Sequence, residues 1–357
     1  MKIILDKIMP KPLTSIHHGP ESIWGKKIEI EPSTRILLNA SSGKGKSTFT
    51  STVFGLRNDY SGDLYFDDQN VRIFTHSKWS DFRQRRISAV FQDLQLFPKL
   101  TVKENLQLKN EITNTYRENE LRELLEYLGI GTKWEQNCGL LSMGQQQRVA
   151  IIRALSQPYE WLLLDEPFSS LDLNLKEEVR DDTLHLLQKS NISVLVVTHD
   201  PFEAMFISNK IYIMNKEGKI VQSGSPKDLY NLPNSSYVAN FFGETNKFTG
   251  VVKNKIVKTA VGDFLTDKSM ESENVSVYIR PEAVKLSREQ TPVNGIKGTV
   301  MASKLMGSYS FVHLSVLSKD NEIVHVHSHM PPNFLPNQSS AVGIEIDREQ
   351  TFIFSNS

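Results

Sequence analysis

The stretch that decides the fold is Ala40-Ser41-Ser42-Gly43-Lys44-Gly45-Lys46-Ser47-Thr48, a run of small residues that ends in Gly-Lys-Ser. The apolar run Ile36-Leu37-Leu38 before it predicts a buried strand, and the residues from Lys46 to about Phe54 favour a helix. The stretch would then lie at the helix N-terminus, where backbone N–H groups without partners attract an anion. We therefore interpret residues 40–48 as a phosphate-binding loop, named the phosphate loop below. An ordinary Gly/Ser turn before a helix is the alternative.

The end of the phosphate loop carries the side chains that a nucleotide needs. Lys46 has the length to reach the β- and γ-phosphates, and the Ser47 hydroxyl can ligate Mg²⁺. One position departs from the motif G-x-x-x-x-G-K-[ST], because Ala40 replaces the first glycine and tolerates positive φ less well. The predicted cofactor-binding residues of the loop are Ser42, Gly43, Lys44, Gly45, Lys46, Ser47 and Thr48.

Length and composition favour a globular protein of two domains, since 357 residues exceed one typical domain. Hydrophobic residues make up 39% and aromatic residues 9%, which is ordinary. The net charge of 0 offers no overall basic field for nucleic acid or an anionic membrane. The single cysteine, Cys138, cannot form an intrachain disulfide and fits a reducing compartment. We expect neither a signal peptide nor a membrane span, so membrane association would need a partner.

Up to about Asn231, short apolar runs alternate with longer helical patterns, which predicts an α/β fold with a largely parallel sheet. The clearest buried strands are Trp161 to Leu164 and Val194 to Val197. Between the phosphate loop and the first of these strands, residues 93–157 form a helix-rich insert, with a capping box at Thr101 to Glu104. We expect residues 1–232 to form this domain.

The character of the chain changes after Tyr230. Residues 233–242 are rich in turn-forming residues at their start and predict a linker. From Gly243 onward, short runs such as Val275 to Ile279 and Phe311 to Val316 alternate with period two. Residues 243–357 therefore predict a small all-β domain of the barrel type.

A second motif follows the run Trp161 to Leu164, which delivers two carboxylates, Asp165 and Glu166, side by side. Ligands of open α/β sheets gather at the carboxyl ends of strands. Asp165 would belong to the Mg²⁺ shell, and Glu166 would polarise the water that attacks the γ-phosphate. A strand that runs into an acidic turn is the alternative for this motif alone.

A third motif is Leu141-Ser142-Met143-Gly144-Gln145, in which Ser142 and Gln145 have the spacing of a helix cap and its partner. Such a helix end presents the Ser142 hydroxyl and backbone N–H groups to an anion. Together and in this order, the motifs resemble the nucleotide-binding subunits of ABC (ATP-binding cassette) transporters. Met143 stands where the signature of that family, Leu-Ser-Gly-Gly-Gln, has a glycine.

The resemblance implies roles for single residues. Gln92 matches a glutamine that contacts Mg²⁺ and relays to the membrane subunits, and His199 matches the histidine that hydrogen-bonds the γ-phosphate. Residues 169–172 match a loop that crosses a dimer interface. In the family two chains stack head to tail, so the helix start at Ser142, Gly144 and Gln145 would contact ATP on the opposite subunit.

The resemblance thus predicts ATP and Mg²⁺ as cofactors. The predicted catalytic residues are Glu166 and His199, and the predicted metal ligands are Ser47, Gln92 and Asp165. Two residues, His17 and Trp24, are candidates for the aromatic side chain that stacks on adenine in the family, and either one can instead be a core or surface residue.

The C-terminal region resembles the TOBE domain of ABC importers through Phe241 to Asn246, Arg280 to Glu282 and Gly298 to Val300. This implies the ATPase subunit of an importer, peripheral on the cytoplasmic face of the cell membrane. Its partners would be a second copy of itself, membrane permease subunits and an extracytoplasmic solute-binding protein, without nucleic acid. Ferric iron or an anion is the favoured cargo. The alternatives are the ATPase of an exporter or lipoprotein-releasing system, and a soluble ABC ATPase outside transport.

Four histidines of the C-terminal region suggest a second hypothesis. His325, His327 and His329 project to the same face of one strand, and we expect His313 on a neighbouring strand. Imidazole groups in such a row can hold a transition-metal ion that regulates the protein. Exposed histidines on a polar strand face are the alternative.

Overall fold

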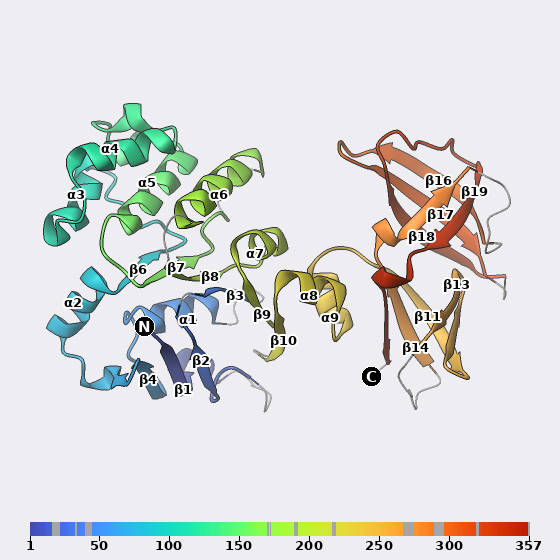
Figure 1. Cartoon of the computed structure of the whole chain (residues 1–357), viewed down its shortest axis with the longest axis horizontal. Coiled ribbons are helices and arrows are strands. Elements are labelled where there is room, and N and C mark those ends of the chain that lie inside the picture. Colours follow the sequence, from blue (N-terminus) through green and yellow to red (C-terminus); the bar gives the residue numbers. More distant parts are fainter. Residues whose placement is uncertain are drawn as a thin grey trace. The chain divides into compact units, whose positions relative to one another are not determined.

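The computed structural model describes residues 1–15, 22–32, 34–39, 45–169, 171, 173–188, 192–215, 219–266, 274–288, 296–318 and 321–355. The chain divides into two units, Met1–Pro226 and Lys227–Ser357, both shown in Figure 1. Within the described residues, no helix combines the length and the apolar character that a membrane crossing requires.

The first unit is built around a six-stranded sheet in the order β10-β9-β3-β8-β7-β6. Neighbouring strands are parallel, except that β10 pairs antiparallel with β9. The bounds are β3 (Arg35–Asn39), β6 (Ile87–Val90), β7 (Trp161–Asp165), β8 (Ser193–Val197), β9 (Lys210–Met214) and β10 (Ile220–Gly224). Every residue of β7 and β8 is buried, as expected for parallel strands covered on both faces. The predicted α/β fold is confirmed.

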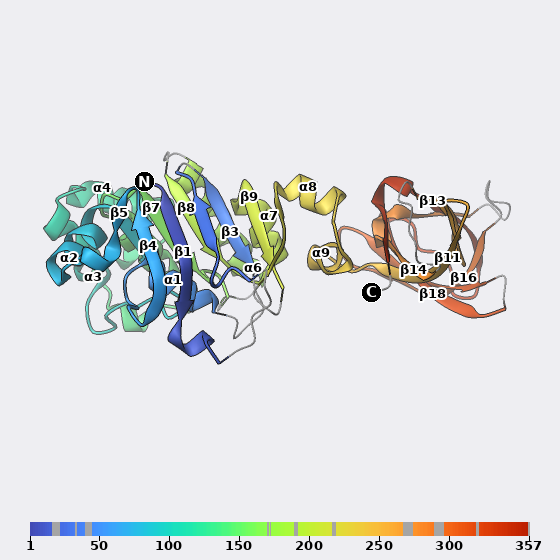
Figure 2. The same ribbon diagram turned by 90° about the horizontal axis from the view of Figure 1, so that it is seen from below.

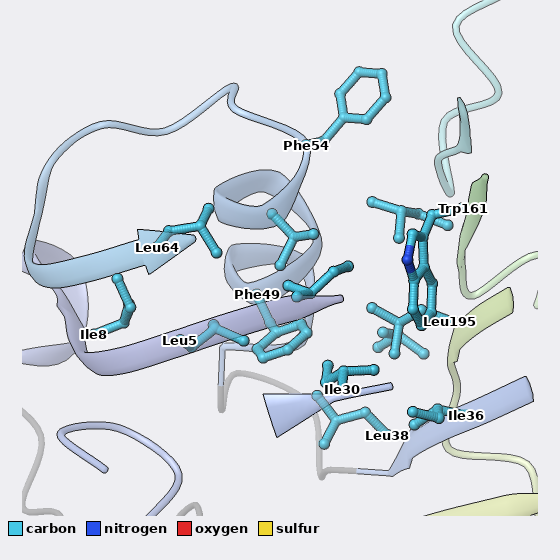
Figure 3. Packing of buried hydrophobic residues seen from close by; sticks show 14 of the residues in the cluster. Leu5, Ile8, Ile30, Ile36, Leu38, Phe49, Phe54, Leu64, Trp161 and Leu195 are labelled. Atoms are coloured by element: carbon cyan, nitrogen blue, oxygen red, sulfur yellow. The ribbon is translucent and has the colours of Figure 1, made fainter. Parts of the chain in front are cut away.

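A second, four-stranded antiparallel sheet has the order β2-β1-β4-β5. Its strands are β1 (Ile3–Pro10), β2 (Lys27–Ile30), β4 (Tyr60–Phe66) and β5 (Gln69–Asn70). One hydrophobic core joins this sheet to the six-stranded sheet and to α1 (Lys46–Val53). Figure 3 shows Phe49 of α1 between Leu5 of β1 and Ile36 and Trp161 of the larger sheet. Helix α1, which begins at the end of the phosphate loop, is therefore anchored in the core.

The further α-helices among the described residues of the first unit are α2 (His76–Arg85), α3 (Val102–Thr113), α4 (Glu118–Tyr127), α5 (Met143–Leu155), α6 (Leu173–Gln188) and α7 (Pro201–Ile207). Helices α3, α4 and α5 lie together at one side of the unit (Figure 1) and share a core of their own that includes Leu106, Leu125 and Val149. The predicted capping box is present, since the Glu104 N–H donates to Thr101 Oγ1 at 3.2 Å and the Thr101 N–H to Glu104 Oε2 at 2.7 Å. The helix-rich insert is confirmed.

The second unit contains two five-stranded antiparallel sheets, in the orders β13-β12-β11-β14-β20 and β15-β19-β16-β17-β18. Their strands are β11 (Asn246–Lys253), β12 (Ile256–Thr259), β13 (Gly262–Leu265), β14 (Asn274–Ile279), β15 (Val284–Ser287), β16 (Lys297–Leu305), β17 (Ser310–Leu317), β18 (Ile323–Met330), β19 (Ala341–Ile346) and β20 (Thr351–Ser355). Figure 2 shows these strands curving around a shared interior, filled by residues such as Val277, Leu314 and Ile344. The predicted all-β domain of the barrel type agrees with this arrangement.

Two short helices precede the β-strands of the second unit, α8 (Pro226–Asn231) and α9 (Ser236–Phe241). The guanidinium of Arg280, 1% exposed, donates to the carbonyl oxygens of Ala239 and Tyr230 at 3.3 and 3.1 Å, and it lies 3.8 Å from the centre of the Tyr230 ring. These contacts fasten both helices to the β-strands. The division of the structure after Pro226 therefore lies earlier than the boundary expected at residue 232, and the expected linker 233–242 includes α9.

Candidate active site

Asp165 and Glu166 lie at the carboxyl end of β7, between the neighbouring strands β6 and β8. Asp165 pairs with Val197 at the end of β8, and the Glu166 N–H donates to the Val197 carbonyl oxygen at 2.7 Å. Glu166 has φ of 48°, a left-handed conformation that costs a non-glycine residue about 1 kcal/mol or more. The turn after β7 is thus sharp, and a hydrogen bond to the adjacent strand holds it.

The Glu166 carboxylate is the centre of the site. Its Oε1 lies 2.6 Å from Nζ of Lys46, at the start of α1, and its Oε2 lies 2.8 Å from Nδ1 of His199, which follows β8. Lys46 and Glu166 are buried, whereas the His199 side chain is 65% exposed. The sheet order places β3, which leads into α1, next to β8, and β8 next to β7. The fold therefore assembles three predicted residues from distant parts of the sequence.

These partners control the protonation of Glu166. Burial alone would raise the pKa of its carboxyl group, because a low-dielectric surrounding disfavours the charged form. Hydrogen bonds and charge interactions with Lys46 and His199 outweigh burial, so the pKa of Glu166 lies below its ordinary value. Glu166 is therefore ionised at neutral pH but engaged by a cation, which makes it a weak base in this arrangement.

Asp165 has the opposite environment. It is 2% exposed, and among the residues that the structure describes its Oδ1 has no hydrogen-bond partner. Burial raises the pKa of its carboxyl group, and a hydrogen bond with Ser47 and the charge of Lys46 only partly oppose this effect. A buried carboxylate oxygen beside a hydroxyl is a donor set that suits Mg²⁺. Asp165 and Ser47 thus fit the predicted metal ion.

No group of three or more His, Cys, Asp or Glu side chains in the described part of the chain could hold a metal ion alone. Mg²⁺ commonly binds proteins through one or two carboxylates together with substrate phosphates and water.

The described part of the phosphate loop begins at Gly45, the N-terminal cap of α1, with φ of 90°. A Cβ atom here would lie 2.7 Å from Leu13 and 3.0 Å from Trp24, so only glycine fits. Thr48, partly buried, lies in the first turn of α1, and its carbonyl oxygen accepts a hydrogen bond from Thr52 Oγ1 at 2.7 Å. The predicted residues Ser42, Gly43 and Lys44, and Ala40, lie outside the described residues.

The structure decides one of the two candidates for adenine stacking. Trp24 is 4% exposed and packs edge-on against Phe49 of α1, with ring centres 6.2 Å apart. It is a core residue, so its role as a stacking platform is not supported in this conformation. His17 lies outside the described residues. Sequence reasoning could not separate a tryptophan in the core from one in a ligand site, since the residue type is common in both.

Gln92 is exposed and follows β6, whose last residue, Val90, pairs with Leu164 just before Asp165. The loop after Gln92 contains two successive left-handed residues, Leu94 with φ of 55° and Gln95 with φ of 48°. Their carbonyl oxygens accept hydrogen bonds from Arg153 of α5, at 2.8 and 2.7 Å. Arg153 thus ties this loop to α5, the helix that starts at the signature motif. Nothing in the sequence singled out this arginine.

The signature motif forms the start of α5. Ser142 is the N-terminal cap, with the Gln145 N–H donating to its Oγ at 3.3 Å and its own N–H donating to Gln145 Oε1 at 3.1 Å, so the predicted capping pair is confirmed. Ser142 and Met143 are exposed, and Met143 is 49% exposed. A Cβ atom on Gly144 would lie 2.3 Å from Leu175 of α6, so Gly144 is required for close helix packing.

Three charged residues close to His199 along the chain or in space were not predicted from the sequence to belong to the site. Lys176 of α6 forms ion pairs with Asp200 at 2.5 Å and Glu203 at 2.7 Å, and Asp200 caps α7. Glu203 is 1% exposed, so Lys176 offsets a buried charge. The pairs brace the segment that carries His199 against α6. Of the predicted interface loop 169–172, Ser170 and Asp172 lie outside the described residues, and Ser169 Oγ donates to the Glu166 carbonyl oxygen at 3.0 Å.

Comparisons with known proteins agree with this architecture. The family described as ABC transporter matches residues 25–169, and the TOBE domain matches residues 277–354. The spermidine/putrescine import ATP-binding protein PotA of Borreliella afzelii is 33% identical over 315 residues, which is 86% of this chain and 88% of that protein. The Fe(3+) ions import ATP-binding protein FbpC of Mannheimia succiniciproducens is 38% identical over 272 residues, 74% of this chain and 75% of that protein.

Two solved structures of one protein extend the comparison. A dimeric structure of a bacterial ABC transporter cassette superimposes with a TM-score of 0.55 and 25% identity, covering 63% of this chain and 98% of that one. A dimeric post-hydrolysis state of this cassette, bound to ADP and Pi, gives a TM-score of 0.54 and 26% identity with the same coverage. This chain therefore belongs to the ATP-binding subunits of ABC transporters, as an ATPase of the importer type with a C-terminal TOBE domain.

Proposed function

We propose that two copies of this chain close head to tail around ATP and thereby drive uptake through membrane permease subunits, with Glu166 as the general base. The observation that carries the proposal is the Glu166 carboxylate at the end of β7, held at 2.6 Å by Lys46 and at 2.8 Å by His199. A carboxylate, an ammonium group and an imidazole at the carboxyl edge of a parallel sheet suit water activation beside a phosphate.

Lys46 acts as a switch on this base. Its ammonium group is paired with Glu166, so a phosphate that binds at the N-terminus of α1 competes with Glu166 for the same cation. Once Lys46 turns to the phosphates, Glu166 loses the hydrogen bond that does most to lower its pKa. The pKa then rises, and Glu166 becomes a stronger base toward water. Bound ATP with Mg²⁺ supplies the phosphoryl group and neutralises its charge.

The other residues position and stabilise. Asp165, Ser47 and Gln92 would hold the metal ion, which accounts for a buried Asp165 oxygen without a partner among the described residues. His199, released from Glu166, would hydrogen-bond the γ-phosphate, and the ion pairs of Lys176 would keep its segment in place. These roles follow from the contacts at the site and from the family resemblance.

The dimer would complete each site with the start of α5 from the partner subunit. The exposed Ser142 cap and the Gly144 and Gln145 backbone form a helix N-terminus that can meet a phosphate. Both solved relatives are described as dimeric. Permease subunits would dock near Gln92 and the helices α3 and α4, and an extracytoplasmic solute-binding protein would deliver the cargo. We place the chain on the cytoplasmic face of the membrane.

Ferric iron remains the first cargo candidate, because one relative is named for Fe(3+) import. Polyamines are the second candidate, since another relative is named for spermidine/putrescine import. The sequence analysis also favoured an anion as cargo, and the names of these two relatives do not support that prediction. Transport assays with the permease genes expressed alongside this chain would separate the two cargoes by uptake of ⁵⁵Fe(3+) or labelled spermidine.

The proposal is tested by ATP hydrolysis and oligomeric state of the purified chain with Mg-ATP. We expect Glu166→Gln to lose turnover by a factor of about 10³ and to accumulate as an ATP-dependent dimer. Glu123→Gln, on the exposed face of α4, is the matched control and should behave as the wild type. A Glu166→Gln variant that hydrolyses ATP at the wild-type rate would overturn the role of Glu166.

A further inference from the structure

The second unit exposes a row of imidazole side chains on two neighbouring strands, β17 and β18. His313 of β17 lies directly opposite His327 of β18, and His325 and His329 are two residues away along β18 on the same face. The alternating residues Val312, Leu314 and Val326 are buried in the domain core. The four histidines therefore share the outer face of this sheet.

Within this row, two imidazole nitrogen atoms from different strands lie close together. His313 Nε2 lies 3.0 Å from His325 Nδ1, and the two rings are 5.0 Å apart. The ring of His327 is 4.9 Å from His313. Two Zn–N bonds of about 2.0–2.1 Å at a tetrahedral angle place their nitrogens about 3.3–3.4 Å apart. An opening of a few tenths of an ångström would let one ion replace the hydrogen bond between His313 and His325.

The four histidines differ in their contacts with carboxylates. In the part of the chain that the structure describes, none of His313, His325 and His327 forms an ion pair with a carboxylate. His329 differs, since its Nδ1 lies 3.9 Å from Glu282 Oε2 and its ring packs against Tyr309. The nitrogens of His313 and His325 are thus not held by a carboxylate of the described residues, and a metal ion can contact them.

We propose that His313 and His325 form a binding site for a divalent transition-metal ion such as Zn²⁺. Imidazole nitrogen suits Zn²⁺, Ni²⁺ and Cu²⁺, whereas Mg²⁺ prefers oxygen, so the site differs in chemistry from the one at Asp165. No three metal-binding side chains of the described residues are arranged to hold an ion together, so the site rests on the pair of histidines, and water completes the shell.

The test is a calorimetric titration of the full-length chain, purified without a histidine tag, with ZnCl₂ at pH 7.5 and excess Mg²⁺. We expect one Zn²⁺ per chain. His313→Asn and His325→Asn should each weaken binding more than about tenfold, and His327→Asn by less. His185→Asn, an exposed histidine of α6, is the matched control and should bind as the wild type. At pH 5.5 binding should weaken, because protons compete for the imidazoles.

One further variant and a folding control make the result decisive. Asp165→Asn should retain the Zn²⁺ stoichiometry, which separates this site from the predicted Mg²⁺ site. Circular dichroism and thermal melting check folding, and His325, the more exposed partner, decides the outcome if His313→Asn fails to fold. The proposal is overturned if the wild type shows no saturable Zn²⁺ binding, or if His325→Asn binds Zn²⁺ as tightly as the wild type.

Discussion

The two units of this chain treat their titratable side chains in opposite ways. In the first unit, the Glu166 carboxylate is buried and contacted by Lys46 and His199 from different elements of the fold. In the second unit, His313, His325 and His327 lie on adjacent strands at the surface, with groups of their own kind as neighbours. In the first arrangement a ligand must displace a paired charge, whereas in the second the imidazole nitrogens can contact a metal ion directly.

This difference indicates which kind of ligand each unit can bind. A buried, charge-paired carboxylate is costly to leave alone, so its partner can be removed only by an incoming charge such as a phosphate. Imidazoles at the sheet surface without a carboxylate partner need no such exchange before they bind a metal ion. The nucleotide site should therefore be sensitive to loss of any one partner, whereas the histidine row should tolerate substitution without loss of fold.

The largest expected effect on stability comes from Lys46→Met. The substitution leaves Glu166 buried without its cation, and breaking such a pair costs about 3–5 kcal/mol. The double variant Lys46→Met/Glu166→Gln should recover part of this loss, because the second substitution removes the uncompensated charge. Urea unfolding of wild type, both single variants and the double variant at pH 7.5 measures the coupling.

His325→Asn is the counterpart in the second unit, and we expect its unfolding free energy to stay within about 0.5 kcal/mol of the wild type. The comparison between the units fails if Lys46→Met and His325→Asn destabilise the chain equally. It also fails if the Lys46 and Glu166 substitutions are additive in the double variant.

A smaller effect distinguishes Asp165 from its neighbour Glu166. The raised pKa of Asp165 means that its charged form costs stability at neutral pH, so Asp165→Asn should be more stable than the wild type by about 1 kcal/mol at pH 7.5. This advantage should disappear as the pH falls through the raised pKa of folded Asp165. Thermal unfolding across pH 3.5–7.5 measures the difference.

Glu166→Gln should give the opposite sign. The folded pKa of Glu166 is lowered, so its charge stabilises the chain above the unfolded pKa of about 4.3, and this contribution is lost as the pH falls through the folded pKa. If Asp165→Asn destabilised the chain at pH 7.5, the account of Asp165 as a buried carboxylate waiting for a metal ion would be wrong.

Much of the fold and the chemistry could be predicted from the sequence, because the informative signals are local. The apolar run before Asp165 and Glu166 predicted a buried strand with carboxylates at its end, and the structure contains β7 there. The spacing of Ser142 and Gln145 predicted a capped helix, which is the start of α5. In each case, residues a few positions apart determine the feature.

Other features could not be predicted, because they depend on contacts between distant residues. Arg153 donates hydrogen bonds to Gln95 and Leu94, which precede it by 58 and 59 positions. Lys176 forms an ion pair with Asp200, which lies 24 positions further along the chain. Trp24 is placed in the core by Phe49 and by the approach of Gly45, which no periodicity in its own segment reveals. The association of α9 with the β-strands depends on the buried Arg280, which lies 41 positions from Ala239.

The central claim, that Lys46 restrains Glu166 until a nucleotide binds, is tested most directly by the pKa of Glu166 itself. Carbon-13 NMR of the glutamate side-chain carboxyl groups, assigned with Glu166→Gln, can follow its titration without and with Mg-ADP. The account predicts a pKa below about 4.3 in the free chain and a rise when Mg-ADP binds or in Lys46→Met. A pKa that is ordinary in the free chain, or that stays unchanged in both cases, would contradict it.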